Sequence, residues 1–159
     1  MIDSRNDIHA KQVDAWALKN TAGLPPEKLV RLFEIAIQAI EQRSLTTLSS
    51  VTVMVVLDRA LHQSKEIFPL LAAVTLDPKG VRLDGIIANS GHHKPEELQA
   101  ALRHLLVEIL SVFGNITAEV LTVPLQKELS KITCESVLKT PEAQGLRVIK
   151  SPKTNQEDR

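Results

Sequence analysis

The sequence predicts an α+β fold: a mainly helical domain with one β-hairpin, at about residues 70–88, packed against or between the helices. Apolar residues recur at helical spacing through most of the chain. One turn sequence, Asp77-Pro78-Lys79-Gly80, separates two short apolar runs. A chain of 159 residues is also long enough to bury about two-thirds of the surface that its unfolded form exposes, so a single domain can fold without a metal or a disulfide.

The pattern of polar residues divides the chain into three parts. Residues 1–22 are polar, with a few apolar residues at helical spacing, and form either an N-terminal arm or a short helix. Residues 23–138 form a single globular α+β domain. From residue 139 the chain becomes polar and contains proline and glycine, which predicts a flexible polar tail over residues 139–159.

The stretch "GLPPEKLVRLFEIAIQAIEQR" predicts the first helix of the domain. Pro26 suits the first helical position, and Glu27 suits the positive end of the helix dipole. A wide apolar face follows at helical spacing, made of Leu29, Leu32, Phe33, Ala36, Ile37 and Ile40. We expect this face to be buried.

The stretch "LSSVTVMVVLDRALHQSKEIFP" fits two structures. A helix from about Ser49 to Phe68 explains it if the first turns are buried on all sides. A strand over 51–57 followed by a short helix is the alternative, which the β-branched residues favour. We prefer the helix because Ser49 or Ser50 can cap it and because no turn residue separates the two halves.

The hairpin is predicted from its turn. Asp77, Pro78 and Gly80 occupy the first, second and fourth positions that a type I turn prefers. The strands then pair Leu76 with Val81, Thr75 with Arg82, Val74 with Leu83 and Ala73 with Asp84. One face carries Ala72, Val74, Leu76, Val81 and Leu83. Arg82 and Asp84 lie on the other face with Thr75, and we name these two charged residues as candidates for contact with a partner.

Two further helices complete the fold. "PEELQAALRHLLVEILSVF" predicts a helix that begins at Pro95, and Gly114-Asn115 offers a stop because both residues tolerate a left-handed conformation. The stretch "ITAEVLTVPLQKELSKI" has apolar residues at helical spacing interrupted by Pro124. We read it as a kinked helix, and a strand over 116–123 followed by a helix is the alternative.

The stretch "NSGHHKPEE" raises the question of a metal site. The simplest interpretation is the exit of a strand followed by a helix that starts at Pro95 and carries acidic residues in its first turn. The candidate metal ligands are His92, His93, Glu97 and His104. Glu97 and His104 lie about 10 Å apart along a helix axis. One ion with ligand bonds near ~2 Å would therefore need ligands from elsewhere in the chain.

The sequence offers no catalytic residue and no cofactor motif. It lacks a Gly-x-Ser-x-Gly elbow and a phosphate-binding glycine loop. Nineteen basic residues balance nineteen acidic ones, which argues against nucleic-acid binding and against an anionic membrane surface. The longest apolar run, "VTVMVVL", is too short to span a membrane. Cys134 is the one cysteine, and the N-terminus lacks the apolar core of a signal peptide, so we expect a cytoplasmic location.

These observations lead to a functional prediction. We expect a non-enzymatic protein-interaction or regulatory module that forms a homodimer in the cytoplasm and binds a further, unidentified protein. The apolar faces of at least four predicted helices and a hairpin exceed what one small bundle obviously covers. The alternative is a ligand- or metal-binding sensor or enzyme with its site at the junction between the hairpin and the Pro95 helix.

Overall fold

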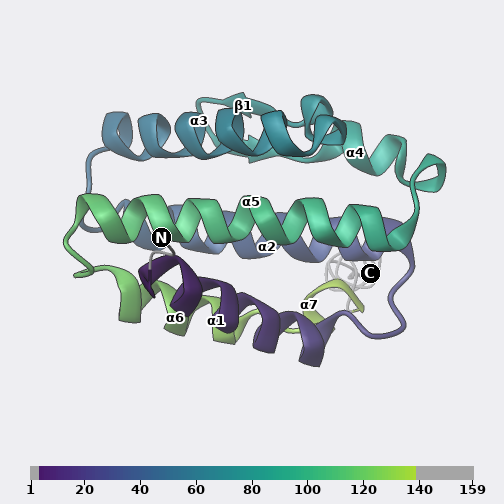
Figure 1. Ribbon diagram of the computed structural model, residues 1–159, viewed down its shortest axis with the longest axis horizontal. Coiled ribbons are helices and arrows are strands. Elements are labelled where there is room, and N and C mark those ends of the chain that lie inside the picture. The colour runs from purple at the N-terminus through teal and green to yellow at the C-terminus, as the bar shows by residue number, and fades with distance from the viewer. Residues whose placement is uncertain (1–3, 139–159) are drawn as a thin grey trace, which may run out of the picture.

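The computed structural model of the protein describes residues 4–138, and it arranges their helices in three layers (Figure 1). One outer layer holds α3 (Ser50–Ile67), the hairpin of β1 (Thr75–Asp77) and β2 (Gly80–Arg82), and α4 (Asp84–Ala88). The middle layer holds α2 (Pro26–Ser44) and α5 (Pro95–Ile116). The other outer layer holds α1 (Ser4–Asn20), α6 (Thr122–Lys131) and α7 (Glu135–Leu138). The predicted α+β class, mainly helical with a packed hairpin, is confirmed.

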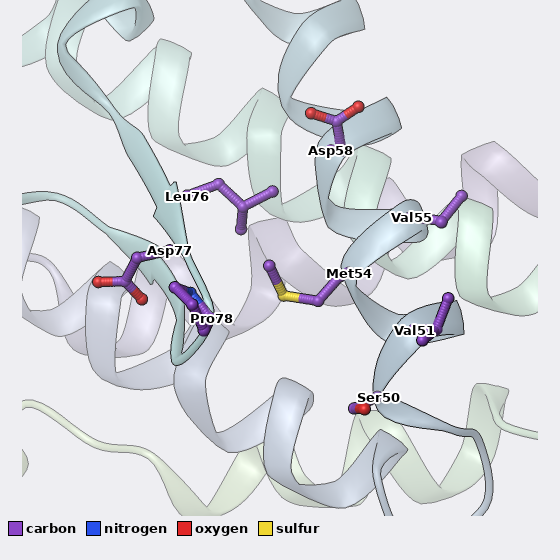
Figure 2. Close-up of a pocket in the computed structure, with 8 residues that line it drawn as sticks. All are labelled: Ser50, Val51, Met54, Val55, Asp58, Leu76, Asp77 and Pro78. Carbon is purple, nitrogen blue, oxygen red and sulfur yellow. The ribbon is translucent and has the colours of Figure 1, made fainter.

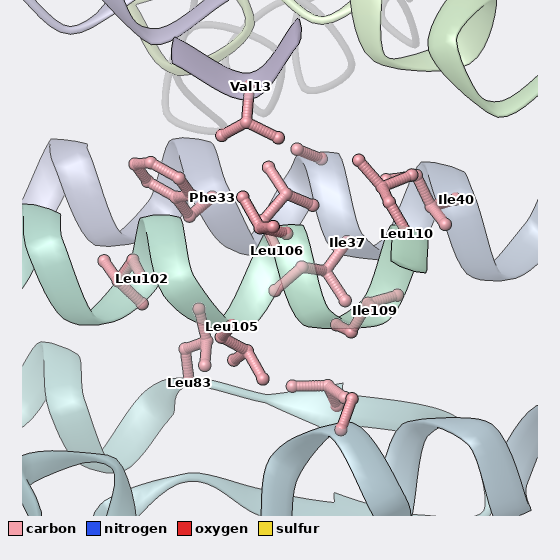
Figure 3. Packing of buried hydrophobic residues seen from close by; sticks show 14 of the residues in the cluster. Val13, Phe33, Ile37, Ile40, Leu83, Leu102, Leu105, Leu106, Ile109 and Leu110 are labelled. Carbon is pink, nitrogen blue, oxygen red and sulfur yellow. The ribbon is translucent and has the colours of Figure 1, made fainter. Parts of the chain in front are cut away.

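The core lies around α5, which packs on α3, α1 and α2. Figure 3 shows how residues from all three layers meet there, with Val13 of α1 on one side and Leu83, at the end of β2, on the other. Aliphatic side chains dominate this core, in keeping with the low aromatic content of 3%. Trp16 and Phe33 form an aromatic pair in this core and meet edge to face with centroids 5.2 Å apart.

The N-terminal residues, for which the sequence allowed an arm or a short helix, form the helix α1 over residues 4–20. Its apolar side bears Val13, Trp16 and Ala17, all of which are buried. The indole Nε1 of Trp16 donates a hydrogen bond to the carbonyl oxygen of Ile132 at 2.7 Å. Because α1 shares the hydrophobic cluster with α2 and α5, it is part of the packed structure of the described residues.

Residues 51–57, for which β-propensity favoured a strand, belong to helix α3. Ser49 caps it, because its hydroxyl accepts a hydrogen bond from the backbone N–H of Thr52 at 3.1 Å. The helix prediction is therefore confirmed. The expectation that its first turns are buried on all sides is wrong: the side chains of Val51 and Val55 are 71% and 61% exposed.

The hairpin keeps the predicted register but is shorter than the predicted range of 70–88. Thr75 pairs with Arg82 and Leu76 with Val81, as the turn sequence implied. Residues Pro69–Ala73 form a 3-10 helix instead of extending the first strand, and residues Asp84–Ala88 form α4. The predicted pairs of Ala73 and Val74 are therefore not part of the ladder. On the predicted inner face Val74, Val81 and Leu83 are buried and Leu76 is half-buried, whereas Ala72 is exposed.

Helix α5 begins at Pro95, as predicted. The residues before it differ from the prediction, because β2 ends at Arg82 and two short helical segments, α4 and a 3-10 turn at Ser90–His92, come between β2 and α5. The stretch "NSGHHKPEE" thus connects two helices and is not the exit of a strand. The backbone N–H groups of Ile86 and Ile87 both donate to the carbonyl oxygen of Leu83, which starts α4 directly after the hairpin.

The end of α5 also differs from the prediction. The helix runs through Gly114 to Ile116, and the left-handed conformation falls on Ala118 and Glu119, with φ of 50° and 68°. The backbone N–H of Glu119 donates to the carbonyl oxygen of Gly114 at 2.7 Å and closes the turn. Residues 117–121 form this turn and α6 follows, with Pro124 in its first turn. Neither the kinked helix nor the strand at 116–123 is present. The predicted tail at 139–159 lies outside the described residues.

Candidate interaction surface

A groove of about 630 Å³ lies between the first half of α3 and the hairpin (Figure 2). Met54 and Leu76 extend toward each other between the helix and the strand, while Val51 and Val55 stand on the flank of α3 away from the hairpin. The residues that line the groove are Ser50, Val51, Met54, Val55, Asp58, Leu76, Asp77 and Pro78. Most of these side chains are apolar, so the groove offers hydrophobic surface to the solvent next to a packed core.

Both charged residues among those eight are aspartates. Asp58 is an exposed residue of α3, and Asp77 is the last residue of β1. The backbone N–H of Lys79 donates to Oδ1 of Asp77 at 2.8 Å, and Nε of Arg82 donates to Oδ2 at 3.2 Å. These bonds hold the pKa of Asp77 below its usual value, with the backbone bond from Lys79 as the main cause. Asp77 is therefore a carboxylate at neutral pH.

Two buried glutamates of α2 fix the hairpin that forms one wall of the groove. Oε2 of Glu41 accepts a hydrogen bond from the backbone N–H of Val81 at 3.0 Å, and Oε2 of Glu34 accepts one from Leu83 at 2.9 Å. The two side chains are only 2% and 3% exposed. Val81 presents its N–H group on the edge of β2 that pairs with no other strand of the described residues, and Leu83 follows directly after β2. The carboxylates therefore satisfy donors that would otherwise be buried without a partner.

Burial changes the chemistry of Glu41. Loss of solvent raises the pKa of Glu41 to about 7, and the hydrogen bond from Val81 and the charge of Arg82 only partly oppose this effect. Glu34 has a charged neighbour, because the Arg31 guanidinium on the same helix forms an ion pair with it. The two glutamates thus perform the same structural task in different electrostatic surroundings.

Gly80 is required where the hairpin meets α2. Its φ is +120°, a conformation that residues with a side chain rarely adopt. A Cβ atom at this position would also lie 2.1 Å from Oε1 of Glu41. The glycine therefore permits both the turn of the hairpin and the close approach of the buried carboxylate.

The two interaction candidates from the hairpin occupy different positions. Arg82 is half-buried and bonded to Asp77 across the hairpin. Asp84 is exposed and lies in the first turn of α4, beyond the end of β2. Neither residue lines the groove, although Arg82 orients one of the carboxylates that do.

The metal candidates do not form one cluster. His93 lies 3.9 Å from Glu97, measured from Nδ1 to Oε1, and His104 lies 3.9 Å from Glu108, measured from Nε2 to Oε1. These are separate pairs, each one helical turn apart in sequence, and His92 is exposed. Within residues 4–138, no group of three or more His, Cys, Asp or Glu side chains is placed to hold a metal ion. The metal hypothesis remains a prediction.

Glu34 and Glu41 were not among the residues expected to be functional, although the sequence carries a signal for them. Both follow directly after apolar residues of the buried face of α2, Phe33 and Ile40, and they lie two helical turns apart. Two glutamates at that spacing on the border of an apolar face lie above each other on the helix. The pattern indicates a shared surface, but it does not reveal that the surface is a strand edge.

The fold and the groove define a helical α+β domain with an open apolar surface. Comparison of the chain with protein-family models, with curated proteins and with solved structures gives no match. None of the helices described over residues 4–138 has the length and apolar character needed to cross a membrane.

Proposed function

We propose that this chain is a non-enzymatic protein-interaction module that receives its partner on the exposed flank of α3 and in the adjoining groove between α3 and the hairpin. The observation that carries the proposal is the exposure of Val51 and Val55, one turn apart on a helix whose opposite side is core. Full burial of a valine side chain stabilises a complex by roughly 1.5 kcal/mol or more. A partner that covers both valines gains that stabilisation at a site already surrounded by further apolar side chains.

The groove is also rigidly built, which favours binding. Ser49 caps the first turn of α3, and Glu34 and Glu41 hold the hairpin against α2. Both walls are therefore fixed before a partner arrives, so association does not have to order them. We propose a regulatory or scaffolding role for this surface because most of the side chains that line the groove are apolar.

A photocrosslinking experiment tests the proposal. A diazirine amino acid of about the size of leucine is introduced at position 55, in the groove, and in a control protein at position 123, where the side chain is 55% exposed on α6. In cells that make the protein, we expect a discrete crosslinked protein from position 55 that disappears when Val51→Asp is added. Equal products from both positions, or no product from either, would contradict the proposal.

A homodimer in the cytoplasm is part of the same proposal, and native mass spectrometry tests the dimer. The spectrum of the purified chain reports both the number of subunits and any tightly bound mass. A dimer that persists in the Val55→Asp variant supports a homodimer that forms elsewhere and leaves the groove free for the partner, whereas a dimer lost in this variant would mean that a second copy occupies the groove. A monomer that carries an ion or a small molecule favours a sensor or an enzyme instead, and His92, His93 and His104 are then the first residues to replace.

A further inference from the structure

We infer that the groove binds a basic amphipathic helix of a partner protein, with the apolar side of that helix on α3 and a cationic side chain at Asp58. This inference rests on the proposed function, because it names the chemistry of the partner for the same surface. Three observations carry it: the ridges on α3, the short free edge of β1, and the sign of the charges that line the groove.

The exposed side of α3 suits another helix. Val51 and Val55 form one ridge with a spacing of four residues, and Met54 and Asp58 form a second ridge beside it. Rows of residues four apart are the ridges that pack into the grooves of a second helix. From Ser50 to Asp58 the lining extends over about 12 Å of helix at ~1.5 Å per residue. A partner helix therefore contacts this surface over two to three turns, with apolar anchors at the positions i, i+3 or i+4, and i+7.

The hairpin offers few backbone hydrogen bonds to an added strand. Val81 directs its N–H to Glu41, so its pair with Leu76 is of the type without hydrogen bonds between the two residues. The peptide groups of Leu76 consequently point away from β2, toward the free edge of β1. Because β1 has only three residues, this edge offers an added strand only the N–H group and the carbonyl oxygen of Leu76. Pro78, which follows the end of β1, has no N–H group. A helix thus fits the groove better than an extended segment.

The charges specify a cationic partner. Both charged residues that line the groove are aspartates, Asp58 on α3 and Asp77 on the hairpin. Figure 2 shows that the carboxylate of Asp77 points away from α3, so Asp58 supplies the charge on the α3 side. Arg82 already bonds Asp77. Within the described residues Asp58 has no ion-pair partner, so it is the main anchor for a lysine or an arginine. An acidic helix would bring like charges together at Asp58, which opposes its binding.

Two designed peptides of 18 residues test the inference by fluorescence anisotropy with the full chain. They share leucines at positions i, i+4, i+7 and i+11, and the flanking positions carry lysine in one peptide and glutamate in the other. We expect the lysine peptide to bind at least about fivefold more tightly, and its affinity to fall as salt is added. Asp58→Asn weakens this binding about two- to fivefold. Asp58→Lys shifts the preference toward the glutamate peptide.

The controls separate this inference from the proposed function. Val55→Asp places a charge under the apolar side of the peptide and should weaken both peptides at least about tenfold, whereas Val123→Asp should change neither. A thermal melt of each variant checks that the variant remains folded. If both peptides bind equally through Val55, the groove binds helices but the charge argument is wrong. If neither peptide binds, or if sedimentation experiments show that only a second copy of the chain occupies the groove, the basic helix is excluded. The crosslinking result at position 55 still decides the proposed function in either case.

Discussion

The carboxylate of Glu41 on α2 accepts a hydrogen bond from the backbone N–H of Val81 on β2, at 3.0 Å. Glu34, two helical turns earlier, does the same for Leu83 at 2.9 Å. Through these bonds α2 satisfies the edge of β2 as a third strand would. A hairpin of three-residue strands is marginal by itself in water, so its position beside α3, and with it the groove, depends on this pair of buried carboxylates.

Glu41 makes the stability of the protein depend on pH. Burial raises its pKa from 4.5 to about 7, so the folded state binds its proton more tightly than the unfolded state. The contribution of Glu41 is therefore fully present below about pH 4.5 and is lost as the pH rises through about 7. Glu41→Gln keeps an oxygen that accepts from Val81 and removes the titration. Between pH 4 and 8, the free energy of unfolding of the wild type should fall relative to that of the variant by up to about 3 kcal/mol. Urea melts measure this difference, and parallel pH profiles would show that Glu41 does not titrate in this range.

Glu34 tests the contribution of the second bond. In Glu34→Ala the N–H of Leu83 loses its acceptor at a buried position, which should lower the free energy of unfolding by about 1–3 kcal/mol. The matched control is Glu27→Ala, because Glu27 is an exposed residue of the same helix. Amide hydrogen exchange provides a local measurement, because the amide of Leu83 should exchange faster in the Glu34 variant than in the wild type. Equal exchange rates would mean that the hydrogen bond to Glu34 does not protect this amide.

Gly80 and Gly91 form a second matched pair. Gly80→Ala forces a side chain into a positive φ and against Glu41, and we expect a loss of at least about 2 kcal/mol in the free energy of unfolding. At Gly91 a Cβ atom would meet nothing within 4 Å, and φ lies outside the positive region. Gly91→Ala should therefore be neutral within about 0.5 kcal/mol. A similar loss of free energy of unfolding in both variants would mean that the effect at Gly80 does not come from its positive φ or from its contact with Glu41.

The elements with local signals could be predicted from the sequence. Pro26 and Pro95 each occupy the first position of their helices, and Ser49 caps α3, because these residues act within one turn of the chain. The register of Leu76 with Val81 also follows from its turn. The short helices on either side of the hairpin could not be predicted this way, since an apolar run such as Leu70 to Val74 fits a strand as well as a buried 3-10 helix.

The candidate site was less predictable, because it depends on contacts between distant residues. The apolar start of α3 indicated burial on all sides, yet its outer side carries the exposed Val51 and Val55. No local pattern shows that the hairpin covers one flank of α3 and leaves the other open. Likewise Glu41 and Val81 are 40 residues apart in sequence, and the bond between them appears only when α2 and β2 are placed together.

The central claim is that Val51 and Val55 form a surface for another molecule and are not part of the core. The most direct test compares the free energy of unfolding of the Val51→Ser/Val55→Ser variant with that of the wild type, at concentrations low enough for a monomer. We predict a difference within about 0.5 kcal/mol, as for exposed positions, whereas the neighbouring pair Val53→Ser/Val56→Ser, which is buried, should lose at least about 2 kcal/mol. A loss of that size in the Val51/Val55 variant would assign these valines to the core and contradict the claim.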